Sequence, residues 1–468
     1  MSDSTYIIAG CGVFGLSTAY HLVNQGVNPS NIQMMDVHAV PSPWSAAADF
    51  NKIIRCEYHK DIYTKLAIES LHQWRDIPLF SQTFNECGRL LATPLSHQGR
   101  IEYEKIGISN LEKYGEGSLY EYWQGGQQLR NVANMATFGK ASKNLTAFID
   151  NNVPPGKEIK WNPESGLGRS GESLTDLFNW LKDKGVKFKF GNEGKVIFTE
   201  KNNDLNGANR CLVTASGERL NADYILLALG ANTGNVINLQ NQQSATGLFV
   251  THIQLNDVEF EKYKNLPVVF DAEMGYFFPP DPKSKILKIC LAGGGIKRLT
   301  NDPFVKGSKL SLPRYHNDHP TDTIPVERAI EVSKILEQYT PELKNHNLFN
   351  SKICWIGDAQ ESHFIIDKIP DCSNIWVATG DSGHGYKFLP NIGKYIIARM
   401  NNTLGDISLL GDNEYGCKLA DAWAWKDNTH SEAVDPAKTK WRVGKSTQDI
   451  SEINFLQEGD QGVLISKF

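Results

Sequence analysis

The first forty residues contain the pattern that most limits how the chain folds. Residues 6–9 form a short apolar run, "YIIA", and three glycines, Gly10, Gly12 and Gly15, follow it in the spacing G-x-G-x-x-G. An apolar strand, a glycine-rich turn and a helix in this order are typical of a dinucleotide-binding βαβ unit. In such a unit Gly10 permits the turn, Gly12 lets the backbone approach a pyrophosphate, and Gly15 lets the helix pack on the strand.

The residues after the turn complete this unit. The amides of Val13 and Phe14 would face the phosphates, because a helix N-terminus supplies N–H donors and a partial positive charge. A second apolar run ends in Asp36, about twenty residues beyond the last glycine, where an acid accepts hydrogen bonds from a ribose. A merely tight turn would explain the glycines but not Asp36. We therefore predict a dinucleotide site.

Length, charge and cysteine usage exclude several classes of protein. A chain of 468 residues is too long for one ordinary core and fits two domains, which could be interleaved. The net charge of −5 offers no basic field for nucleic acid. The sequence contains no run of about twenty apolar residues, so we predict no membrane span. The N-terminus lacks the pattern of a secretory signal. The eight cysteines are scattered without a C-x-x-C pair, so we expect a reducing compartment and neither a metal site nor disulfides.

The chain ends in Ser466, Lys467 and Phe468. This tripeptide resembles the S-K-L peroxisomal address, with Phe in place of Leu, and the residues before it are polar. A chance match is the alternative. We expect the peroxisomal import receptor as a partner and a peroxisomal location, with the cytoplasm as the alternative. We expect the protein to be a monomer.

Two stretches in the middle of the chain favour a flavin over a nicotinamide. Residues 217–231, "GERLNADYILLALGA", resemble the strand-plus-glycine segment of flavoproteins of the D-amino-acid oxidase and glutathione reductase type. Residues 185–200, which include Val196, look like the strand pair beside the adenine half. Two ordinary strands are the alternative. Together with the N-terminal unit, these stretches predict FAD.

The whole set of ordered motifs resembles one family. Between about residues 5 and 430 the chain contains "GCGVFG", "DFNKIIR", "HIQL", "GYFFPPD", "SLPRYHNDHPTDTIP", "CWIGD" and "ATGDSGHGYKFLPNIG". It resembles the monomeric sarcosine oxidase and fructosyl-amino-acid oxidase (amadoriase) family, which includes fungal saccharopine and pipecolate oxidases. The resemblance implies an α/β fold with a discontinuous Rossmann-like FAD-binding domain and an α+β substrate domain whose sheet is mostly antiparallel. We expect the FAD-binding domain at residues 1–90, 165–245 and 345–405, the substrate domain at 90–165 and 245–345, and a C-terminal, loop-like tail at 406–468.

The resemblance also implies how the cofactor is held. The family attaches FAD through a thioether from a cysteine to the flavin 8-methyl carbon, and Cys354 occupies the matching position. A buried free cysteine is the alternative, because that is the usual fate of this residue. The other cofactor contacts that we expect are Ser45, Lys52, Val196, Asp381, Gly383, Gly385, Tyr386 and Lys387.

Four cations match residues of the family's active site. In sarcosine oxidase-like members the residue that matches Lys52 lies over the flavin. The residue that matches Arg55 binds the substrate carboxylate, together with the lysine that matches Lys387. A solvated helix edge is the alternative for Lys52 and Arg55. Lys288 matches a lysine near the flavin N5 that stabilises superoxide during reoxidation, which would make the protein an oxidase. The alternative is an exposed lysine on an edge strand.

The substrate follows from where the chain departs from amadoriases. The resemblance suggests that those enzymes carry a neutral residue where Arg55 stands, acids where Leu291 and Ala292 stand, and an arginine where Ala424 stands. A site without these polar groups has little reason to select a sugar adduct. We therefore predict an FAD-dependent oxidase that acts on CH–NH donors, cleaving the C–N bond of an N-substituted or cyclic α-amino acid. Saccharopine, pipecolate and sarcosine fit this description, and O2 would be converted to H2O2.

Several interpretations remain open beside this one. The main alternative function is an amadoriase that deglycates fructosyl amino acids; a nicotinamide-dependent dehydrogenase and a non-catalytic flavoprotein are further alternatives. Tyr276, Phe277 and Phe278 either line the substrate pocket or pack in the core. His384 either contacts cofactor or substrate or is a structural histidine.

Overall fold

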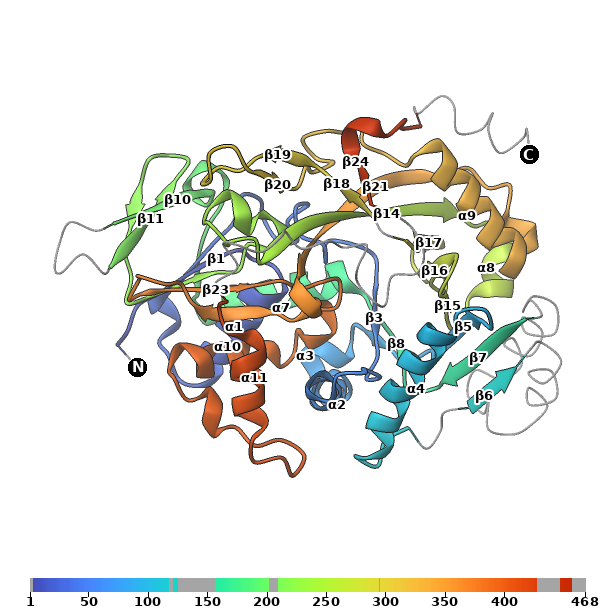
Figure 1. The fold of residues 1–468 in the computed structure, drawn as a ribbon, viewed down its shortest axis with the longest axis horizontal. Helices are drawn as coiled ribbons and strands as arrows, with labels where there is room; N and C mark the ends of the chain where they lie inside the picture. The colour runs from blue at the N-terminus through green and yellow to red at the C-terminus, as the bar shows by residue number, and fades with distance from the viewer. Residues whose placement is uncertain are drawn as a thin grey trace.

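The computed structural model describes residues 3–117, 121–124, 156–201, 209–293, 295–426 and 447–456. The predicted targeting tripeptide at 466–468 lies outside the described residues, as does most of the polar stretch that follows residue 426. Figure 1 shows two halves, each built around one sheet, with the long strand β14 (Gln243–Gln254) running between them.

The first half contains a six-stranded sheet of the predicted dinucleotide-binding type. Its central strand β1 pairs in parallel with β2 on one side and β13 on the other, and an antiparallel strand, β22, forms one edge. The strand β1 is buried along its length, as expected of a parallel strand covered on both faces. The strand order is β22 (Ile365–Lys368), β23 (Ile375–Thr379), β13 (Tyr224–Leu227), β1 (Tyr6–Ala9), β2 (Ile32–Met35) and β9 (Lys187–Lys189).

Close helix packing explains two of the glycines in this half. Helix α1 (Val13–Asn24) starts directly after the glycine turn. A Cβ on Gly15 would lie 1.9 Å from the Gly10 carbonyl oxygen, so only glycine fits there. A Cβ on Gly393, in α10 (Ile392–Met400), would lie 2.1 Å from the Ser17 carbonyl oxygen of α1. This half also contains the helices α2 (Asp61–Asp76), α3 (Pro78–Ser81) and α7 (Ser170–Lys184).

The second half is built on a mostly antiparallel sheet, as predicted. The pairs β15–β5 and β18–β24 are its parallel exceptions among the described strands. The strand order is β24 (Gln448–Asp449), β18 (Ile296–Lys297), β14, β17 (Ile286–Leu291), β16 (Gly275–Phe277), β15 (Val268–Asp271), β5 (Arg89–Pro94), β7 (Lys157–Asn162) and β6 (Glu121–Gln124), and β21 (Phe349–Ala359) also pairs with β14. The helices α4 (Gln98–Glu112), α8 (Asp257–Tyr263) and α9 (Val326–Tyr339) belong to this half.

The two faces of this sheet differ in polarity. Leu287 and Ile289 of β17 pack in one apolar cluster with Val332 of α9. Successive side chains of a strand point to opposite faces, so Lys288 and Cys290 point away from α9. The face that carries Lys288 and Cys290 is therefore the one that meets the first half of the molecule.

Smaller sheets connect and flank the two halves. These are β3 (Lys52–Ile54) with β8 (Gly166–Gly168) and β4 (Phe84–Asn85), β10 (Val196–Lys201) with β11 (Arg210–Thr214) and β12 (Arg219–Leu220), and the hairpin β19 (Leu299–Asn301) with β20 (Lys309–Ser311). The proposed domain division stays a prediction; strand pairing joins β21 to the second sheet, although it lies in the 345–405 segment.

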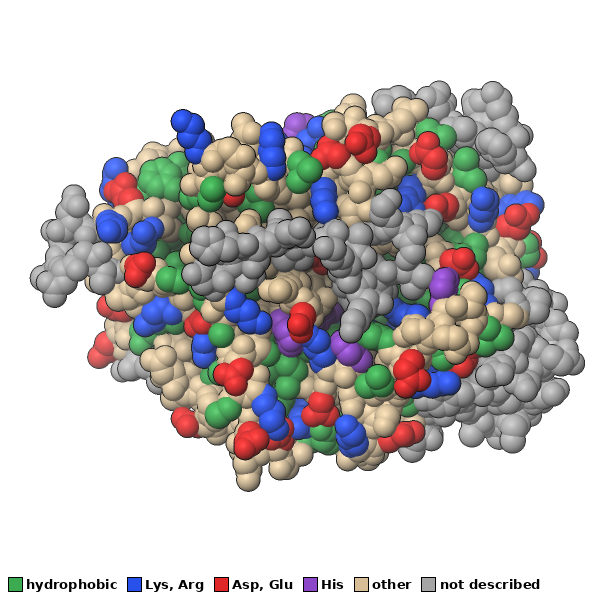
Figure 2. Space-filling model, viewed as in Figure 1, with side chains coloured by type: hydrophobic (Ala, Val, Ile, Leu, Met, Phe, Trp, Pro, Cys, Tyr) green, Lys and Arg blue, Asp and Glu red, His purple; other side chains and the backbone are tan. Residues whose placement is uncertain are grey.

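The C-terminal segment contains a helix that the sequence patterns did not predict. Helix α11 (Tyr415–Trp423) buries Tyr415, Leu419 and Trp423 in the core of the first half, so this part of the expected loop-like tail is helical. Among the described residues, no helix is both long enough and apolar enough to cross a membrane. Figure 2 shows acidic and basic side chains interspersed over the viewed face.

Candidate functional site

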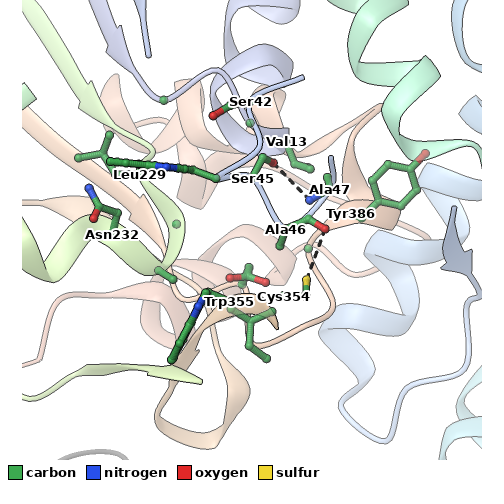
Figure 3. Close-up of a pocket in the computed structure, with 18 of the residues that line it drawn as sticks. Val13, Ser42, Ser45, Ala46, Ala47, Leu229, Asn232, Cys354, Trp355 and Tyr386 are labelled. Atoms are coloured by element: carbon green, nitrogen blue, oxygen red, sulfur yellow. Dashed lines mark hydrogen bonds between the residues drawn. The ribbon is translucent and has the colours of Figure 1, made fainter. Parts of the chain in front are cut away.

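A cavity lies where the two halves meet. One side is formed by residues at the carboxyl ends of β1, β2, β13 and β23, where ligands bind in open parallel sheets. The other side is formed by β14, β16, β17 and β21 of the second sheet. Figure 3 shows Val13, Ser45 and Ala46 from the first half across from Cys354 and Trp355 of β21.

Most of the predicted cofactor residues line this cavity. Gly15 and Lys387 are the two that do not: Gly15 supports helix packing, and Lys387 lies in a neighbouring cluster. Those that line it are Gly10, Gly12, Val13, Phe14, Asp36, Ser45, Lys52, Val196, Cys354, Asp381, Gly383, Gly385 and Tyr386.

The nucleotide end of the cavity fits a dinucleotide. Gly10 has φ +106°, and a Cβ there would lie 2.2 Å from the Ala228 carbonyl oxygen. A Cβ on Gly12 would have its nearest neighbouring atom 3.5 Å away, so the backbone at this position is open to a ligand. The Asp36 carboxylate accepts the Cys11 N–H at 2.8 Å, and burial raises the pKa of Asp36. Within the described part of the chain no side chain caps the first turn of α1, so its amides stay available for phosphate.

Aromatic residues that the sequence patterns did not predict also line the cavity. Trp44 stacks on Tyr315 with ring centroids 4.6 Å apart, and the Trp44 Nε1–H donates to Asp318 at 3.1 Å. This stack joins a loop of the first half to a loop of the second, and no periodic pattern marks either loop. The other unpredicted lining residues include Ser42, Ala46, Ala47, Asn232, Trp355 and Thr379.

Cys354 lies on the cavity wall next to a cation. Its thiol approaches the Ala46 carbonyl oxygen at 3.6 Å, as Figure 3 shows, and Lys52 Nζ lies 3.9 Å from its sulfur. The position therefore suits a cysteine that reacts with a group bound in the cavity.

Lys52 and Lys288 share one buried carboxylate. Asp49 Oδ2 lies 3.0 Å from Lys52 Nζ and 2.6 Å from Lys288 Nζ. Lys288 also donates to the Asn51 carbonyl oxygen at 2.6 Å. Lys288 is 1% exposed and β17 lies between β14 and β16, so the alternative of an exposed lysine on an edge strand is wrong. Lys288 does not line the cavity, whereas Lys52 does.

Mutual interaction sets the charges of this trio. Burial would raise the pKa of Asp49, but Lys288 and Lys52 hold it well below its usual value. Burial and the nearby Lys52 lower the pKa of Lys288, while Asp49 opposes this shift. Burial alone would lower the pKa of Lys52, but Cys354 and Asp49 raise this pKa overall. Asp49 is therefore the counter-ion that the two lysines share.

A second cluster contains the predicted carboxylate anchors. Arg55 Cζ lies 4.4 Å from the centre of the Tyr58 ring, and Lys387 Nζ lies 5.5 Å from the same centre. Lys387 also donates to the His384 carbonyl oxygen at 2.9 Å, and Arg55 donates to the Glu57 carbonyl oxygen. Arg55 follows strand β3 and is half-buried, so a solvated helix edge is the wrong description of this segment. The structure thus brings Arg55 and Lys387 together against one ring.

His384 has a structural role in this cluster. Its Nε2 lies 2.9 Å from the Ser362 carbonyl oxygen and must carry the proton there, so its Nδ1 accepts the Tyr58 hydroxyl at 3.2 Å. Burial and the charge of Lys387 hold the pKa of His384 well below its usual value. The neutral ring therefore fixes Tyr58 beneath the two cations.

The three aromatic residues of the 276–278 run occupy different places. Tyr276 lines the cavity. Phe278 is buried but does not line the cavity, and the centre of its ring lies 4.9 Å from Lys288 Nζ. Phe277 points to the opposite face, where it packs near Tyr339 of α9, so it does not line the pocket. Leu291 also borders the cavity, but it packs in the same apolar cluster as Leu287 and Ile289 of β17.

Comparison with known proteins identifies the class of this fold and site. Residues 5–399 match the family described as FAD dependent oxidoreductase, so the chain belongs to this family and FAD is its cofactor. L-saccharopine oxidase of Schizosaccharomyces pombe is 35% identical over 460 residues, which cover 97% of this chain and 99% of that protein. Monomeric sarcosine oxidase of Bacillus sp. (strain NS-129) is 23% identical over 434 residues, or 88% of this chain and 97% of that protein.

Solved structures with the same fold include deglycating enzymes. Fructosyl peptide oxidase from E. terrenum has a TM-score of 0.83 and 28% identity, covering 98% of this chain and 99% of that one. Amadoriase II from Aspergillus fumigatus, in complex with FSA, has a TM-score of 0.80 and 26% identity, covering 97% of each chain. The family resemblance, the fold class and FAD, all predicted from the sequence, are confirmed.

Proposed function

We propose that this protein is an FAD-dependent oxidase of secondary amines that are α-amino acids substituted on nitrogen, of the saccharopine type. The observation that carries the proposal is the placement of Arg55 and Lys387 against the ring of Tyr58, beside the flavin cavity. Two cations at one buried place suit a carboxylate. The 35% identity to a saccharopine oxidase over nearly the whole chain supports the same substrate class.

The residues of the chain have distinct tasks in this proposal. Bound FAD would accept a hydride equivalent from the carbon next to the amine nitrogen and pass electrons to oxygen. Arg55 and Lys387 hold the substrate carboxylate, which fixes the amine relative to the cavity and lowers the barrier through orientation. Lys52 and Lys288 supply positive charge near the cavity wall, where charge develops as oxygen is reduced. Water then hydrolyses the released imine to a carbonyl compound and an amine.

An amadoriase is the second candidate, because the solved structures with this fold include fructosyl peptide oxidases. Two positions speak against it. Leu291 and Ala424 stand where the family resemblance suggests polar groups in amadoriases, and neither side chain can donate to a sugar hydroxyl. Arg55 in turn provides the carboxylate anchor that an α-amino acid needs.

A panel of amines with a peroxide readout tests the proposed function. We expect peroxide with saccharopine, and less or none with fructosyl-valine, because the site lacks the sugar-binding groups. Pipecolate and sarcosine belong in the same panel. Higher kcat/KM for fructosyl-valine than for saccharopine would contradict the proposal and favour an amadoriase.

We expect covalent attachment of the flavin through Cys354. Its sulfur lies 3.9 Å from Lys52 Nζ, on the wall of the cavity that would hold the flavin. After acid precipitation the yellow colour should stay with the wild-type protein and move to the supernatant for Cys354→Ala. The exposed Cys417 offers a control, since Cys417→Ala should keep the colour with the protein. Colour released from the wild type would show that attachment does not occur.

Carboxylate binding should weaken as the pH rises, because it depends on a protonated Lys387. In the free protein, burial and Arg55 hold the pKa of Lys387 well below its usual value. A bound carboxylate favours the charged amine, so binding takes up a proton above the free-state pKa. The Kd of acetate, measured by flavin absorbance, should be constant below that pKa and rise about tenfold per pH unit above it.

Lys387→Met should bind acetate weakly and without this pH dependence. Lys418→Met, at an exposed lysine of α11, should retain the wild-type profile. The same pH dependence in the Lys387 variant would assign the titration to another group.

We further propose that the protein is a monomer and acts in peroxisomes, where catalase removes peroxide. The C-terminal tripeptide, Ser466 to Phe468, supports this location through its similarity to the S-K-L address. Deleting the tripeptide from a fluorescent fusion should abolish punctate localisation.

A further inference from the structure

A buried arginine next to the carboxylate anchors has an unmet hydrogen-bond donor. Arg89 begins β5 and is 5% exposed, and its Nη2 pairs with the Glu57 carboxylate. Its Nε has no hydrogen-bond partner among the described residues. The Asn162 amide lies 3.4 Å from both oxygens of Glu57. A buried guanidinium N–H without a partner is unusual, because leaving it unmet is costly.

Arg89 is linked to the anchors through Glu57. The carbonyl oxygen of Glu57 accepts from Arg55, while its side chain accepts from Arg89. Arg89 Cζ also lies 5.8 Å from the ring of Phe270, which stacks on Tyr276 at 5.2 Å. Tyr276 lines the flavin cavity, so this chain of contacts places Arg89 on the face of the sheet that the cavity uses.

The named charged groups around Lys387 are mainly basic. The charged groups that act most strongly on Lys387 are Arg55, Glu57 and Arg89. Glu57 is thus one carboxylate among three basic side chains, in a place where Arg89 and Lys387 are both buried. Excess buried positive charge is costly unless an anion compensates it. One substrate carboxylate would compensate Arg55 and Lys387 only in part.

We propose that Arg89 binds a second carboxylate of the substrate, so that the preferred substrates are secondary amines of a dicarboxylic amino acid. This inference rests on the proposed function. The first carboxylate would lie on Arg55 and Lys387 and the second on the guanidinium of Arg89, with Glu57 between the two arginines. N-substituted glutamates have this arrangement, and saccharopine is one of them.

A matched pair of substrates tests this site. N-methyl-L-glutamate and N-methyl-L-glutamine have the same length and shape and differ in the charge of the distal group. We expect the wild type to favour the glutamate derivative by roughly 10- to 100-fold in kcat/KM, as for a charge-assisted hydrogen bond. Glutarate should likewise bind more tightly than glutaramate in a flavin absorbance titration, which does not depend on turnover.

Variants at Arg89 should remove the preference, because kcat/KM for the glutamate derivative should fall toward that for the glutamine derivative. Arg89→Lys retains the partner of Glu57 but loses the guanidinium, and Arg89→Met with Glu57→Gln removes both charges of the pair together. Both should oxidise the two substrates with similar kcat/KM. The control Arg399→Met disrupts an arginine–aspartate pair elsewhere, with Asp367, and should keep the preference. Thermal unfolding and flavin content report whether each variant folds.

The outcomes separate this inference from the proposed function. Equal kcat/KM for the two substrates in the wild type would show that Arg89 is a structural ion-pair partner only, while peroxide from either would still support amine oxidation. Absence of peroxide with every amine would overturn the proposed function itself. In that case glutarate binding no tighter than glutaramate would overturn the second-carboxylate site as well.

Discussion

Replacing Lys288 by methionine should slow the reaction of the reduced protein with oxygen by roughly 100- to 1,000-fold, the usual effect of removing one preorganised group that stabilises developing charge. Lys288 Nζ is held between Asp49 and the Asn51 carbonyl oxygen and is almost fully buried. A cation fixed in a site that excludes water stabilises charge more strongly than one in solvent. Methionine keeps the shape of the side chain and removes that charge.

Stopped-flow measurements separate the two half-reactions for Lys288→Met. Anaerobic reduction by substrate should stay close to the wild-type rate, because Arg55 and Lys387 are unchanged. The rate of flavin reoxidation on mixing with oxygen should fall by the factor given above. Lys283→Met, at a lysine that is 73% exposed, serves as the control and should reoxidise normally. A normal reoxidation rate in Lys288→Met would mean that Lys52 or another group carries this role.

Replacing Arg55 by methionine should raise KM for carboxylate-bearing amines by about 10- to 150-fold, which corresponds to roughly 1.5–3 kcal/mol for a hydrogen bond to a charged group. Arg55 lies 4.4 Å over the Tyr58 ring and near Lys387, whose pKa it lowers. Part of the lost binding should be offset, because Lys387 is more easily protonated without Arg55. The loss should therefore fall short of that caused by removing both cations.

A substrate and its methyl ester provide the internal comparison for Arg55→Met. The wild type should prefer the acid, whereas the variant should treat acid and ester more equally. Arg219→Met, at an exposed arginine of β12, should behave as the wild type. An unchanged ratio of acid to ester in Arg55→Met would remove Arg55 from the carboxylate site and return the substrate question to the amadoriase alternative.

The nucleotide-binding part of the fold could be predicted from the sequence because its signals are local. The strand at Tyr6–Ala9, the helix after it and the strand before Asp36 follow directly from an apolar run, three glycines and a second apolar run. Helix α11 was missed, although Tyr415, Leu419 and Trp423 recur every four residues. One short helix among polar neighbours gives too weak a period to recognise.

Only those site residues that belong to recognisable motifs could be predicted from the sequence. The motif match names Lys52, Arg55 and Lys288 as candidates, but their partners depend on contacts between distant parts of the chain. The bond from Lys288 to the Asn51 carbonyl joins residues 237 positions apart. The shared carboxylate of Asp49 and the pairing of Glu57 with Arg89 arise in the same way, since no local pattern records which segments the fold brings together.

The shared carboxylate also makes the oxygen chemistry conditional on correct assembly. Asp49 comes from the loop before β3, whereas Lys288 comes from β17 in the other half of the molecule. Burial acts against the charge of Lys288, and Asp49 offsets this. Under the proposed role of Lys288, a chain whose halves have not yet docked therefore lacks the Lys288–Asp49 pair that promotes electron transfer to oxygen. A newly made chain would then be a poor source of peroxide until it has folded completely.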